Sequence, residues 1–451
     1  MREVRTLEPE RGYDVESLSF DHVIGIVQAA FDELPDTRRG KNVQYEIGDA
    51  AVGAFSVFFT QSPSFLAHQR DMQRQKGRNN GSSVFGLRQV PTDNQIRNLL
   101  DPVEPSYLKR PFWELFAALE SGGVLDGYRS LNGTYLCALD GTYYFSSQKI
   151  RCDNCTVRTH DEKEYYSHSA ITPVLAAPGN RHVIALEPEF ILPQDGVEKQ
   201  DCEQQAAKRW VRRNASRFKP QQVTILADDL HCKQPFCEVL LEHQMHFVMT
   251  CKPDSHPTLY EEVELLNQID GLSEFSLRRW TGRYTEVWHC RYTNQLPLRD
   301  TLDTLRVNWC EVTIHREDTG ERIYKNAFAT SHALSEETLL PIITAGRTRW
   351  KIENENNNVL KNYGYHLEHN YGHGKQYLAA ILVLLNLLAF LLHTILDLTD
   401  RRYQLIRQEL GTRKTFFHDI QALTRYLYFD SWESLLSFMF EQLEIELPAP
   451  D

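Results

Sequence analysis

The spacing of hydrophobic residues along the chain separates a helical N-terminal part from a strand-rich part. Over residues 1–125, apolar residues recur at helical spacing, as in FDHVIGIVQAAFDEL and IGDAAVGAFSVFFT. A third segment, PTDNQIRNLL, places Thr92 or Asp93 where the N-cap of a helix belongs. We therefore expect a helical domain over residues 1–125.

From residue 131 the pattern becomes that of β-strands. Three β-rich runs, TYLCALDGTYYFSS, YYSHSAITPVLAA and HVIALEPEFIL, are separated by Gly, Pro and charged turns. A helix (CEQQAAKRWVRRNASRF), a short strand (VTILAD), a second helix (QPFCEVLLEH) and another strand (HFVMTCKP) follow. A meander followed by helix–strand–helix–strand is the order of a ribonuclease H-like α/β core. We assign its first part to residues 126–269.

The alternation breaks after residue 269. Further strand-like segments predict a β-rich subdomain inserted over residues 270–330. Two helices then complete the core over residues 331–400, and a helical C-terminal tail covers residues 401–451. The second of these helices contains an uncharged run at residues 376–396, QYLAAILVLLNLLAFLLHTIL, which is long enough to cross a bilayer. Asn386 and His393 interrupt the run, and the mean hydropathy of the chain is −0.46, so we expect a buried core helix.

Composition restricts the classes of protein that need to be considered. Hydrophobic residues make up 41% of the chain and charged residues 24%, which is typical of a soluble globular protein. The N-terminus has no apolar segment of a secretory signal, and nine scattered cysteines fit a reducing compartment. The net charge of −12 means that any binding to nucleic acid has to rest on local basic patches and metal ions.

One such basic patch lies in HQRDMQRQKGRNNGSS, at residues 68–83. One interpretation is a solvated helix end that runs into a loop. The other is an arm that contacts DNA phosphates through Arg70, Arg74, Lys76 and Arg78. We adopt the second interpretation because of the acidic residues described next.

Two aspartates directly follow apolar strands. Asp140 follows YLCAL and precedes Gly141, and Asp228 follows VTILA. Carboxylates at the ends of neighbouring core strands point into one crevice, where they need cations. Taken singly, each aspartate is also explained as a turn former or a helix N-cap. Asp228 is followed by Asp229, and only one of them can point into the crevice from an extended strand.

A third acidic residue lies in the segment RTRWKIENENNNVLK. On a helix, Arg349 and Glu353 are about 40° apart and share one face. Glu353 can then join the two aspartates while Arg349 reaches a DNA phosphate. The alternative is an ordinary surface ion pair, which contributes about 0.3–0.5 kcal/mol.

The segments LDGTYYF, ILADDLHC and RWKIENENNNVLKNYGYHLEH resemble the three acidic motifs of bacterial insertion-sequence DDE transposases with a β-rich insertion before the glutamate. The resemblance covers roughly residues 130–375. Arg349 and Glu353 match the last motif, whereas Gly346 stands at its tyrosine. Lys361 comes one place later than the lysine of the motif, and the resemblance implies that it contacts a DNA phosphate. The family pattern puts the metal ligand directly after the apolar run, which selects Asp228 and leaves Asp229 free to cap the next helix or hold a turn.

The resemblance implies a ribonuclease H-like fold in which Asp140, Asp228 and Glu353 hold two Mg²⁺ ions, for which Mn²⁺ can substitute. It implies cleavage of double-stranded DNA at transposon ends and joining to target DNA, by a homodimer in the DNA complex. We accordingly expect a cytoplasmic, nucleoid-associated protein of a bacterium or archaeon. Two alternatives remain open: a nuclease of the same fold that does not join strands, and a domesticated transposase that only binds DNA.

Tryptophans in the expected insertion add a further candidate. Relatives with such an insertion hold a flipped base on a tryptophan, and Trp280 or the nearby Trp288 could do so here. We expect core packing for Trp288 and leave both interpretations open for Trp280. The basic run KRWVRRNASRFK, at residues 208–219, is either a solvated helix face or a flank of the DNA channel.

Cysteine and histidine residues suggest a possible second metal site. Cys152 and Cys155 form a CxxC, with His160 and His168 downstream, but a structural zinc needs four ligands and a lone CxxC supplies two. We therefore expect a turn with reduced, inert thiols. The run HLEHNYGHG offers His366, His369 and His373, which we expect to serve the active site or DNA instead of a metal of their own.

Overall fold

The apolar strands form one large mixed sheet in the computed structural model, which describes residues 18–38, 45–73, 75–89, 91–195 and 199–445. The chain divides into two compact units. Unit 1 comprises Met1–Ile96, Ser106–Gly127 and Leu388–Asp451, and unit 2 comprises Arg97–Pro105 and Tyr128–Leu387. The expected α/β class with a mixed sheet is confirmed.

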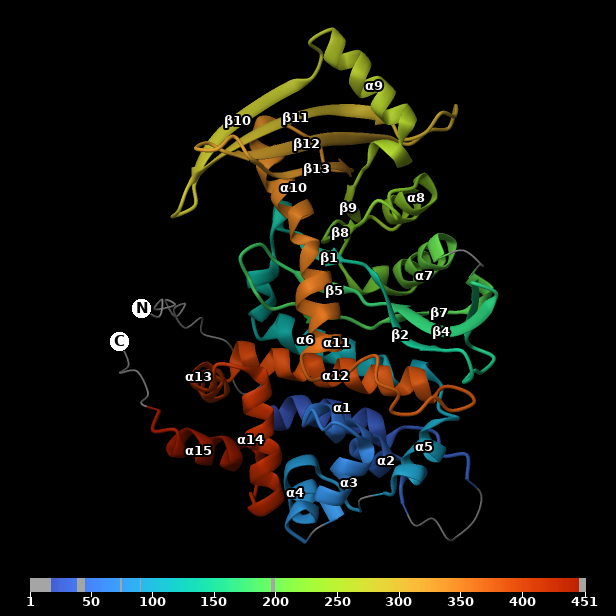
Figure 1. The fold of residues 1–451 in the computed structure, drawn as a ribbon, viewed down its shortest axis with the longest axis vertical. Helices are drawn as coiled ribbons and strands as arrows, with labels where there is room; N and C mark the ends of the chain where they lie inside the picture. Colours follow the sequence, from blue (N-terminus) through green and yellow to red (C-terminus); the bar gives the residue numbers. More distant parts are fainter. Residues whose placement is uncertain (1–17, 39–44, 74, 90, 196–198, 446–451) are drawn as a thin grey trace. The chain divides into compact units, whose positions relative to one another are not determined.

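Unit 1 is built of helices (Figure 1). The two helices expected near its start are present as α1 (Phe20–Asp32), which Ser19 caps, and α2 (Ile47–Phe59). The C-terminal helices fall in this same unit, whereas we expected a separate tail. Its other helices are α3 (Phe65–Gln73), α4 (Gln75–Phe85), α6 (Arg110–Ser121), α13 (Arg401–Leu410), α14 (Arg413–Tyr426) and α15 (Trp432–Gln442).

The Gly/Asn/Ser-rich segment near residue 80 is helical, not the loop that its composition suggested. Asn80 on α4 is fully buried, and its amide donates hydrogen bonds of 2.7 Å to the carbonyls of Thr424 and Leu427. Its carbonyl oxygen accepts from the Phe429 N–H at 2.9 Å. The tertiary contact with the end of α14 thus overrides the weak helix propensity of this segment.

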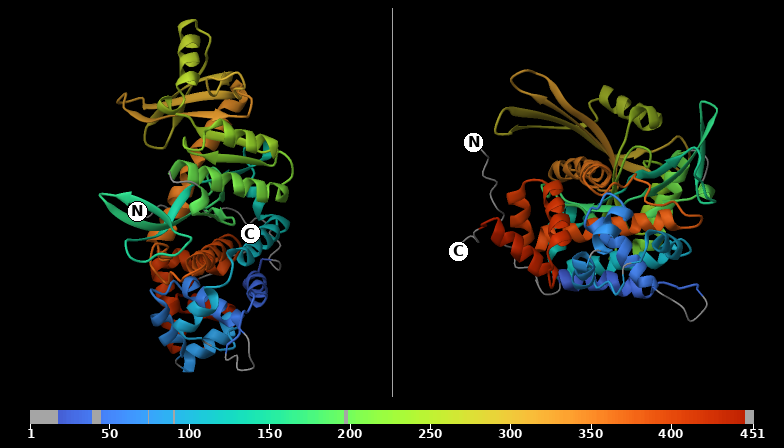
Figure 2. Two further views of the ribbon diagram at one scale, coloured as in Figure 1. Left: turned by 90° about the vertical axis from the view of Figure 1, so that its right-hand side faces the viewer. Right: turned by 60° about the horizontal axis from the view of Figure 1, so that its bottom comes forward.

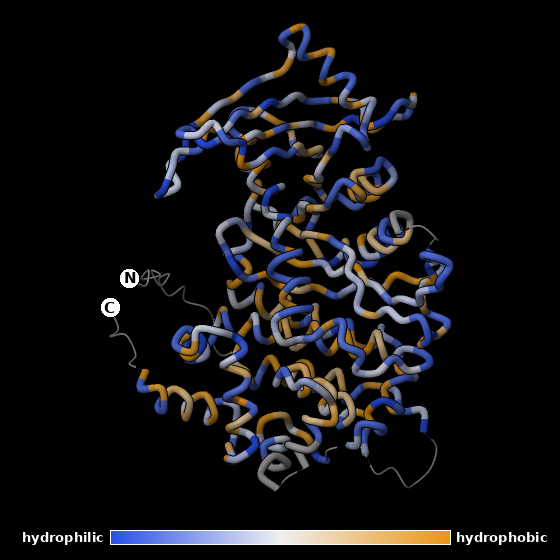
Figure 3. The backbone as a smooth tube through the Cα atoms, in the orientation of Figure 1, coloured by the Kyte–Doolittle hydropathy of each residue, from blue (hydrophilic) through white to orange (hydrophobic). Residues whose placement is uncertain are grey.

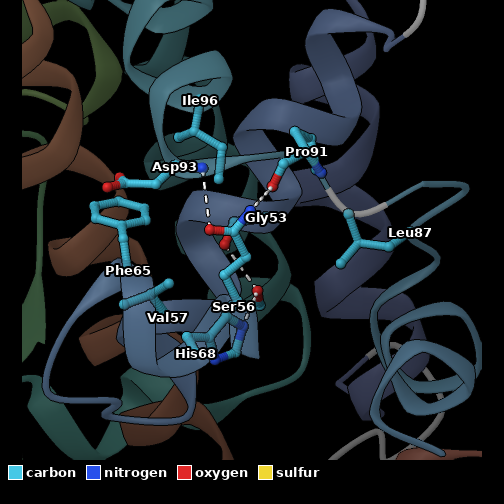
Figure 4. A pocket seen from close by; sticks show the side chains of 10 residues that line it. Gly53, Ser56, Val57, Phe65, His68, Leu87, Pro91, Asp93 and Ile96 are labelled. Carbon is cyan, nitrogen blue, oxygen red and sulfur yellow. Dashed lines mark hydrogen bonds between the residues drawn. The ribbon is translucent and has the colours of Figure 1, made fainter. Parts of the chain in front are cut away.

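A small cavity lies among the N-terminal helices (Figure 4). Its volume is ≈ 10 Å³, which is room for about one water molecule. Beside it, the ring of His68 is hydrogen-bonded to Ser56 at 2.8 Å and to Ser62 at 3.0 Å. The cavity is therefore a packing gap and too small for a ligand.

Helix α5 (Asp93–Leu100) begins in unit 1 and ends in unit 2. Of its two candidate N-caps, Thr92 is the one whose side chain accepts from the Gln95 N–H, at 3.3 Å.

Unit 2 contains the nine-stranded sheet, in the order β10-β11-β12-β13-β9-β8-β1-β5-β6. At its centre β1 (Tyr135–Ala138), β8 (Val223–Ala227) and β9 (His246–Thr250) run parallel. Every residue of β1 and β8 is buried, as expected for strands covered on both faces. On the other side of β1, β5 (Val174–Ala176) is antiparallel to β1. The next strand, β6 (Ile184–Ala185), is antiparallel to β5.

Three strands of the expected meander each bend from this sheet into a second one. The second sheet consists of β2 (Gly141–Ser147), β3 (Thr156–His160), β4 (Lys163–Ile171) and β7 (Glu189–Ile191). The ladder pairs Ala138 with Val174 and, past the bend, Gly141 with Ile171. Pro173 lies at the bend, opposite Leu139, and has no N–H to donate, which interrupts the ladder at that position.

The β-rich segment expected over residues 270–330 is present as four strands, and these strands extend the core sheet because β13 pairs with β9. They are β10 (Ser273–Trp280), β11 (Thr285–Pro297), β12 (Arg306–Arg316) and β13 (Arg322–Thr330). Helix α9 (Pro257–Gln268) lies along one side of them (Figure 2). Hydrophobic and hydrophilic residues alternate along the outermost strands, as in a sheet with one exposed face (Figure 3).

The helices of unit 2 flank the sheets. They are α7 (Lys199–Asn214), α8 (Gln234–Glu242), α9, α10 (Glu336–Thr348), a π-helix (Ile352–Asn357), α11 (Asn358–Asn362) and the start of α12 (Leu378–Thr399). Short 3-10 helices complete the described chain at Pro105–Leu108, Val124–Tyr128, Leu131–Gly133, Pro193–Asp195, Ala215–Arg217 and Pro253–Ser255.

Helix α12 is long and apolar enough to cross a membrane, but 89% of its most apolar stretch of 18 residues is buried within the protein. The two polar residues within the apolar run, Asn386 and His393, are both buried. Asn386 donates to the carbonyl of Tyr365 at 2.8 Å, and the ring of His393 lies between those of Phe59 and Phe417. These features are those of the core helix of a soluble protein, as the sequence predicted.

Candidate active site

Asp140 and Asp228 lie at the same edge of the sheet. Strands β1 and β8 are adjacent and parallel, and Ala138 is paired with Leu226. Each aspartate comes two residues after its member of this pair, so both carboxylates lie just beyond the carboxyl ends of the two strands. The backbone of Asp140 is fixed by the hydrogen bond that its carbonyl accepts from Thr172 N–H at 3.0 Å.

The neighbouring residues Asp228 and Asp229 have different hydrogen-bond partners. Asp228 accepts from the His231 ring at 2.9 Å and from the Leu230 N–H at 3.1 Å. Asp229 accepts from the Lys252 N–H at 2.7 Å and also from the Ser255 hydroxyl. Asp229 thus holds the turn after β9. It does not cap α8, whose N-cap has no side-chain hydrogen bond.

Glu353 reaches this region from the π-helix that follows α10. Its carboxylate accepts a hydrogen bond of 2.6 Å from Arg349, four residues earlier, and half of its side chain is exposed. The expected shared face of these two residues is therefore present. π-Helical turns within helices are often found at functional sites. We expected one continuous helix through this segment, and the structure has α10, the π-helix and α11 in succession.

The charges of the three acidic residues act on one another. Burial raises the pKa of Asp140 to about 6, together with the negative charges of Asp228, Glu353 and Glu203. Burial alone would raise the pKa of Asp228, but the hydrogen bonds and charge of His231 together with the charge of Arg349 outweigh it, so the net pKa is lowered. The site therefore combines one readily ionised aspartate with one whose ionisation the neighbouring charges oppose.

The carboxylate oxygens of the three residues are not packed into one tight cluster. Among the residues that the structure describes, only two groups bring three or more possible ligand atoms within 4.8 Å of one another, and both consist of Cys and His. The acidic site is thus wider than the coordination shell of a single ion.

Two further residues belong to this site and were not identified from the sequence. The Asn357 amide donates to the Asp140 carboxylate at 3.0 Å, and its oxygen accepts from Thr172 at 2.9 Å. Buried Glu203 on α7 lies so close to Gly141 that a Cβ there would be 2.7 Å from its carboxyl carbon. Asn357 comes four residues after Glu353, and this helical spacing could have identified Asn357 as a neighbour of the acidic residues from the sequence.

Gly346, which stands where the resembling family has tyrosine, packs against Phe328 of β13. A Cβ at this position would lie 2.6 Å from the Phe328 ring. Any larger residue would have to displace that ring, so the departure from the family motif has a steric reason.

The residues considered as DNA contacts have different surroundings in the structure. Lys361 is ion-paired with Glu368 at 2.8 Å. Trp280 is 65% exposed at the end of β10, whereas Trp288 is buried as expected, beneath the guanidinium of Arg347. Arg74 lies outside the described residues, as do the side chains of Arg70, Lys76 and Arg78.

The basic run on α7 is partly neutralised within the protein. Arg209 is ion-paired with Asp195 at 2.6 Å and with Glu189, and Arg213 is ion-paired with Glu189 at 2.6 Å. Both arginines therefore pair with buried acidic residues of unit 2, while Arg213 remains 42% exposed, as on the solvated helix face that was one of the two expectations.

The two cysteines are free, as expected, but the CxxC does not stand alone, so the expectation that only two possible ligands are present is wrong. The structure brings Cys152 and Cys155 together with His168 and His373. His366 and His369 are exposed and lie outside this group, as does His160, which faces Asp161.

Comparison with known protein families finds no family model that matches this chain, and comparison with curated proteins finds no match either.

Proposed function

We propose that the protein is a DNA transposase that cleaves transposon ends and joins them to target DNA at Asp140, Asp228 and Glu353. The observation that carries this proposal is that three carboxylates lie near one edge of the sheet, although they do not form a tight cluster. Two of them extend from adjacent parallel strands, and the charge of Glu353 is close enough to help raise the pKa of Asp140. Like charges held together in this way favour a bound divalent cation.

The strand order supports a ribonuclease H-like core. With each bent strand of the meander counted as one, the first three strands are antiparallel and the next two, β8 and β9, run parallel to the first. Across the sheet they lie in the order third, second, first, fourth, fifth. Helices α7 and α8 connect them, which is the order of elements that suggested this fold from the sequence.

The residues present fit Mg²⁺, with Mn²⁺ as a substitute. All three side chains offer carboxylate oxygens, the ligands that Mg²⁺ prefers. When bound, a pair of such ions supplies charge stabilisation to the attacking and leaving oxygens of a phosphodiester. Asp140 and Asp228 would be shared ligands at the strand ends, and Glu353 would complete the site from the helix.

Other residues of the chain would hold these groups and the DNA in place. Asn357 orients the Asp140 carboxylate through its 3.0 Å hydrogen bond. Arg349, which is paired with Glu353, is positioned to exchange this partner for a DNA phosphate when Glu353 binds a cation. Exposed Trp280 offers a flat surface on which an unpaired base can stack. The working form on DNA would be a homodimer in the cytoplasm, associated with the nucleoid.

A plasmid assay tests the proposal. The substrate is a supercoiled plasmid that carries the coding region with its genomic flanks, incubated with Mg²⁺ or with Ca²⁺ in its place. We expect nicked and joined products with Mg²⁺ alone, and none from Glu353→Gln. Glu355→Gln, two residues along the same helix, is the matched control and should retain activity.

The outcomes separate the alternatives. Cleavage without joined products would identify a nuclease that does not transfer strands. Retention of the plasmid flanks on native gels without any cleavage would identify a protein that only binds DNA. Cleavage by Glu353→Gln at the wild-type rate would refute the proposed site.

A further inference from the structure

Four possible metal ligands meet in unit 2, away from the three carboxylates described above. Cys152 and Cys155 lie on the loop between β2 and β3, His168 lies on β4, and His373 lies on the segment between α11 and α12. Three of the four are buried and Cys152 is partly buried. His373 is 218 residues from Cys155 in sequence, so folding alone brings the group together.

Five of the six distances between the four ligand atoms match those of a tetrahedral site, and all four atoms lie within 4.8 Å of one another. The two Sγ atoms are 3.8 Å apart, and the two Nε2 atoms are 3.1 Å apart. The sulfur–nitrogen distances are 3.5 Å for Cys152 to His168, 3.4 Å for Cys155 to His168 and 3.5 Å for Cys155 to His373. Bond lengths of about 2.3 Å to sulfur and about 2.0 Å to nitrogen in a regular tetrahedron give about 3.8, 3.3 and 3.5 Å for these separations.

The surroundings of His373 suit a metal ligand. Its Nδ1 is 2.9 Å from the carbonyl of Gly374, which accepts the proton of that nitrogen and leaves the lone pair of Nε2 directed at the cysteines. The His168 ring is stacked on Tyr144, with 7° between the planes, and the His373 ring lies against Phe145. Such packing restricts the orientation of both rings.

We propose that Cys152, Cys155, His168 and His373 bind one structural Zn²⁺ ion. A set of two thiolates and two imidazoles in tetrahedral arrangement selects zinc over Mg²⁺ or Ca²⁺, which prefer oxygen ligands. All four positions are filled by the protein, so the ion would stabilise the fold and would have no open position for chemistry. This inference does not depend on the proposed transposase activity.

The alternative chemistry of a CxxC pair is a disulfide. The Sγ–Sγ distance of 3.8 Å is far beyond the bond length of about 2.05 Å, and a disulfide would leave the two histidine nitrogens facing each other without a shared cation.

A second group, Cys232, Cys251 and His256, is less suited to a metal. It has three ligands, and the ring nitrogens of His256 already face the carbonyl of Cys232 at 2.6 Å and the carboxylate of Asp229 at 3.4 Å. A fourth ligand and a free nitrogen are both missing from it among the described residues.

The zinc would join segments that lead to the acidic residues. The strand β2 that carries the chain away from Asp140 is followed by the CxxC loop, and the segment with His373 follows the helices that hold Glu353 and Asn357. The two segments are also linked by the Asn154 amide, which donates to the Gln376 carbonyl at 3.0 Å. The ion would therefore fix one end of the π-helix–α11 segment against the strands.

Metal analysis of the purified full-length chain, without a polyhistidine tag, tests the site. We expect about one zinc per chain in the wild type and close to none in Cys155→Ser and His373→Gln. The controls Cys290→Ser and His369→Gln change the same residue types elsewhere and should keep the zinc. Substitution of Co²⁺ for zinc should give the visible absorption of a tetrahedral thiolate site.

Measurements on the wild type keep the test independent of how the variants fold. Alkylation followed by mass spectrometry should find Cys152 and Cys155 protected, and the partly exposed Cys152 should become reactive after chelation. A wild-type protein that contains no zinc and takes up no Co²⁺ would overturn the proposal. A Cys152–Cys155 disulfide, or zinc that is lost only in Cys251→Ser, would overturn it as well.

Discussion

Replacement of Asp140 by asparagine should stabilise the protein in the absence of divalent cations. In the folded protein the pKa of Asp140 is raised from 3.8 to about 6, through burial and the charges of Asp228, Glu353 and Glu203. A carboxyl group with a raised pKa opposes folding when it is ionised. At about 1.4 kcal/mol per pKa unit this amounts to at most about 3 kcal/mol, and water in the cleft should reduce the effect to about 1–3 kcal/mol.

The sign of this effect depends on pH. Above about pH 6 the folded protein carries the ionised carboxylate and bears the full cost, and below about pH 4 the group is protonated in both states and the cost vanishes. Asp140→Asn should therefore raise the melting temperature at about pH 8, by roughly 2–6 °C, with the gain falling as the pH drops through 6. Asparagine can still accept the hydrogen bond from Asn357, so this contact is retained.

Differential scanning fluorimetry across this pH range measures the effect. Asp229→Asn is the matched control, because hydrogen bonds from His256 and Ser255 outweigh burial and lower the pKa of Asp229, so that its loss should destabilise the protein at neutral pH. Added Mg²⁺ should raise the melting temperature of the wild type and have little effect on Asp140→Asn. Destabilisation by Asp140→Asn that is equal at all pH values would refute the idea that the carboxylates repel one another.

Three further changes test separate features of unit 2. Asn357→Ala should weaken the response of the melting temperature to Mg²⁺ and slow cleavage, because it removes the hydrogen bond that orients Asp140; unchanged values for both would exclude a positioning effect. Gly346→Ala should lower stability by about 1–3 kcal/mol through its clash with the Phe328 ring, and Phe328→Leu should restore part of the loss, as thermal melting of the double variant would show. Trp280→Ala should leave stability unchanged, since the side chain is 65% exposed, but should reduce strand cleavage in the plasmid assay if a base stacks there.

Local patterns predicted the elements well where each element depends on its own residues. The helix expected at FDHVIGIVQAAFDEL is α1, and the apolar runs before Asp140 and Asp228 are the buried strands β1 and β8. The adjacency of the two aspartates followed from the order of strands and helices. The preference for Asp228 over Asp229 agrees with the charges that act on Asp140, among which Asp228 is prominent.

Features that depend on distant parts of the chain could not be predicted in this way. The segment around Asn80 is helical because its amide is bound by residues more than 340 positions away. The sequence predicted strands at β10 to β13 but could not show that they continue the core sheet, because the pairing of β13 with β9 leaves no local pattern. The CxxC motif alone supplies two possible ligands, and the other two, His168 and His373, are brought to it only by the tertiary fold.

The proposed zinc site and the acidic site share two segments of the chain, and this changes how metal dependence should be measured. A strong chelator would remove zinc as well as Mg²⁺, and loss of zinc would release the segment that follows Glu353 and Asn357. After EDTA treatment and its removal, we expect Mg²⁺ alone to restore little cleavage, and Zn²⁺ together with Mg²⁺ to restore it. Simple omission of Mg²⁺ should be fully reversible by Mg²⁺ alone. Full recovery of EDTA-treated protein with Mg²⁺ alone would show that the Cys and His residues do not position the three carboxylates.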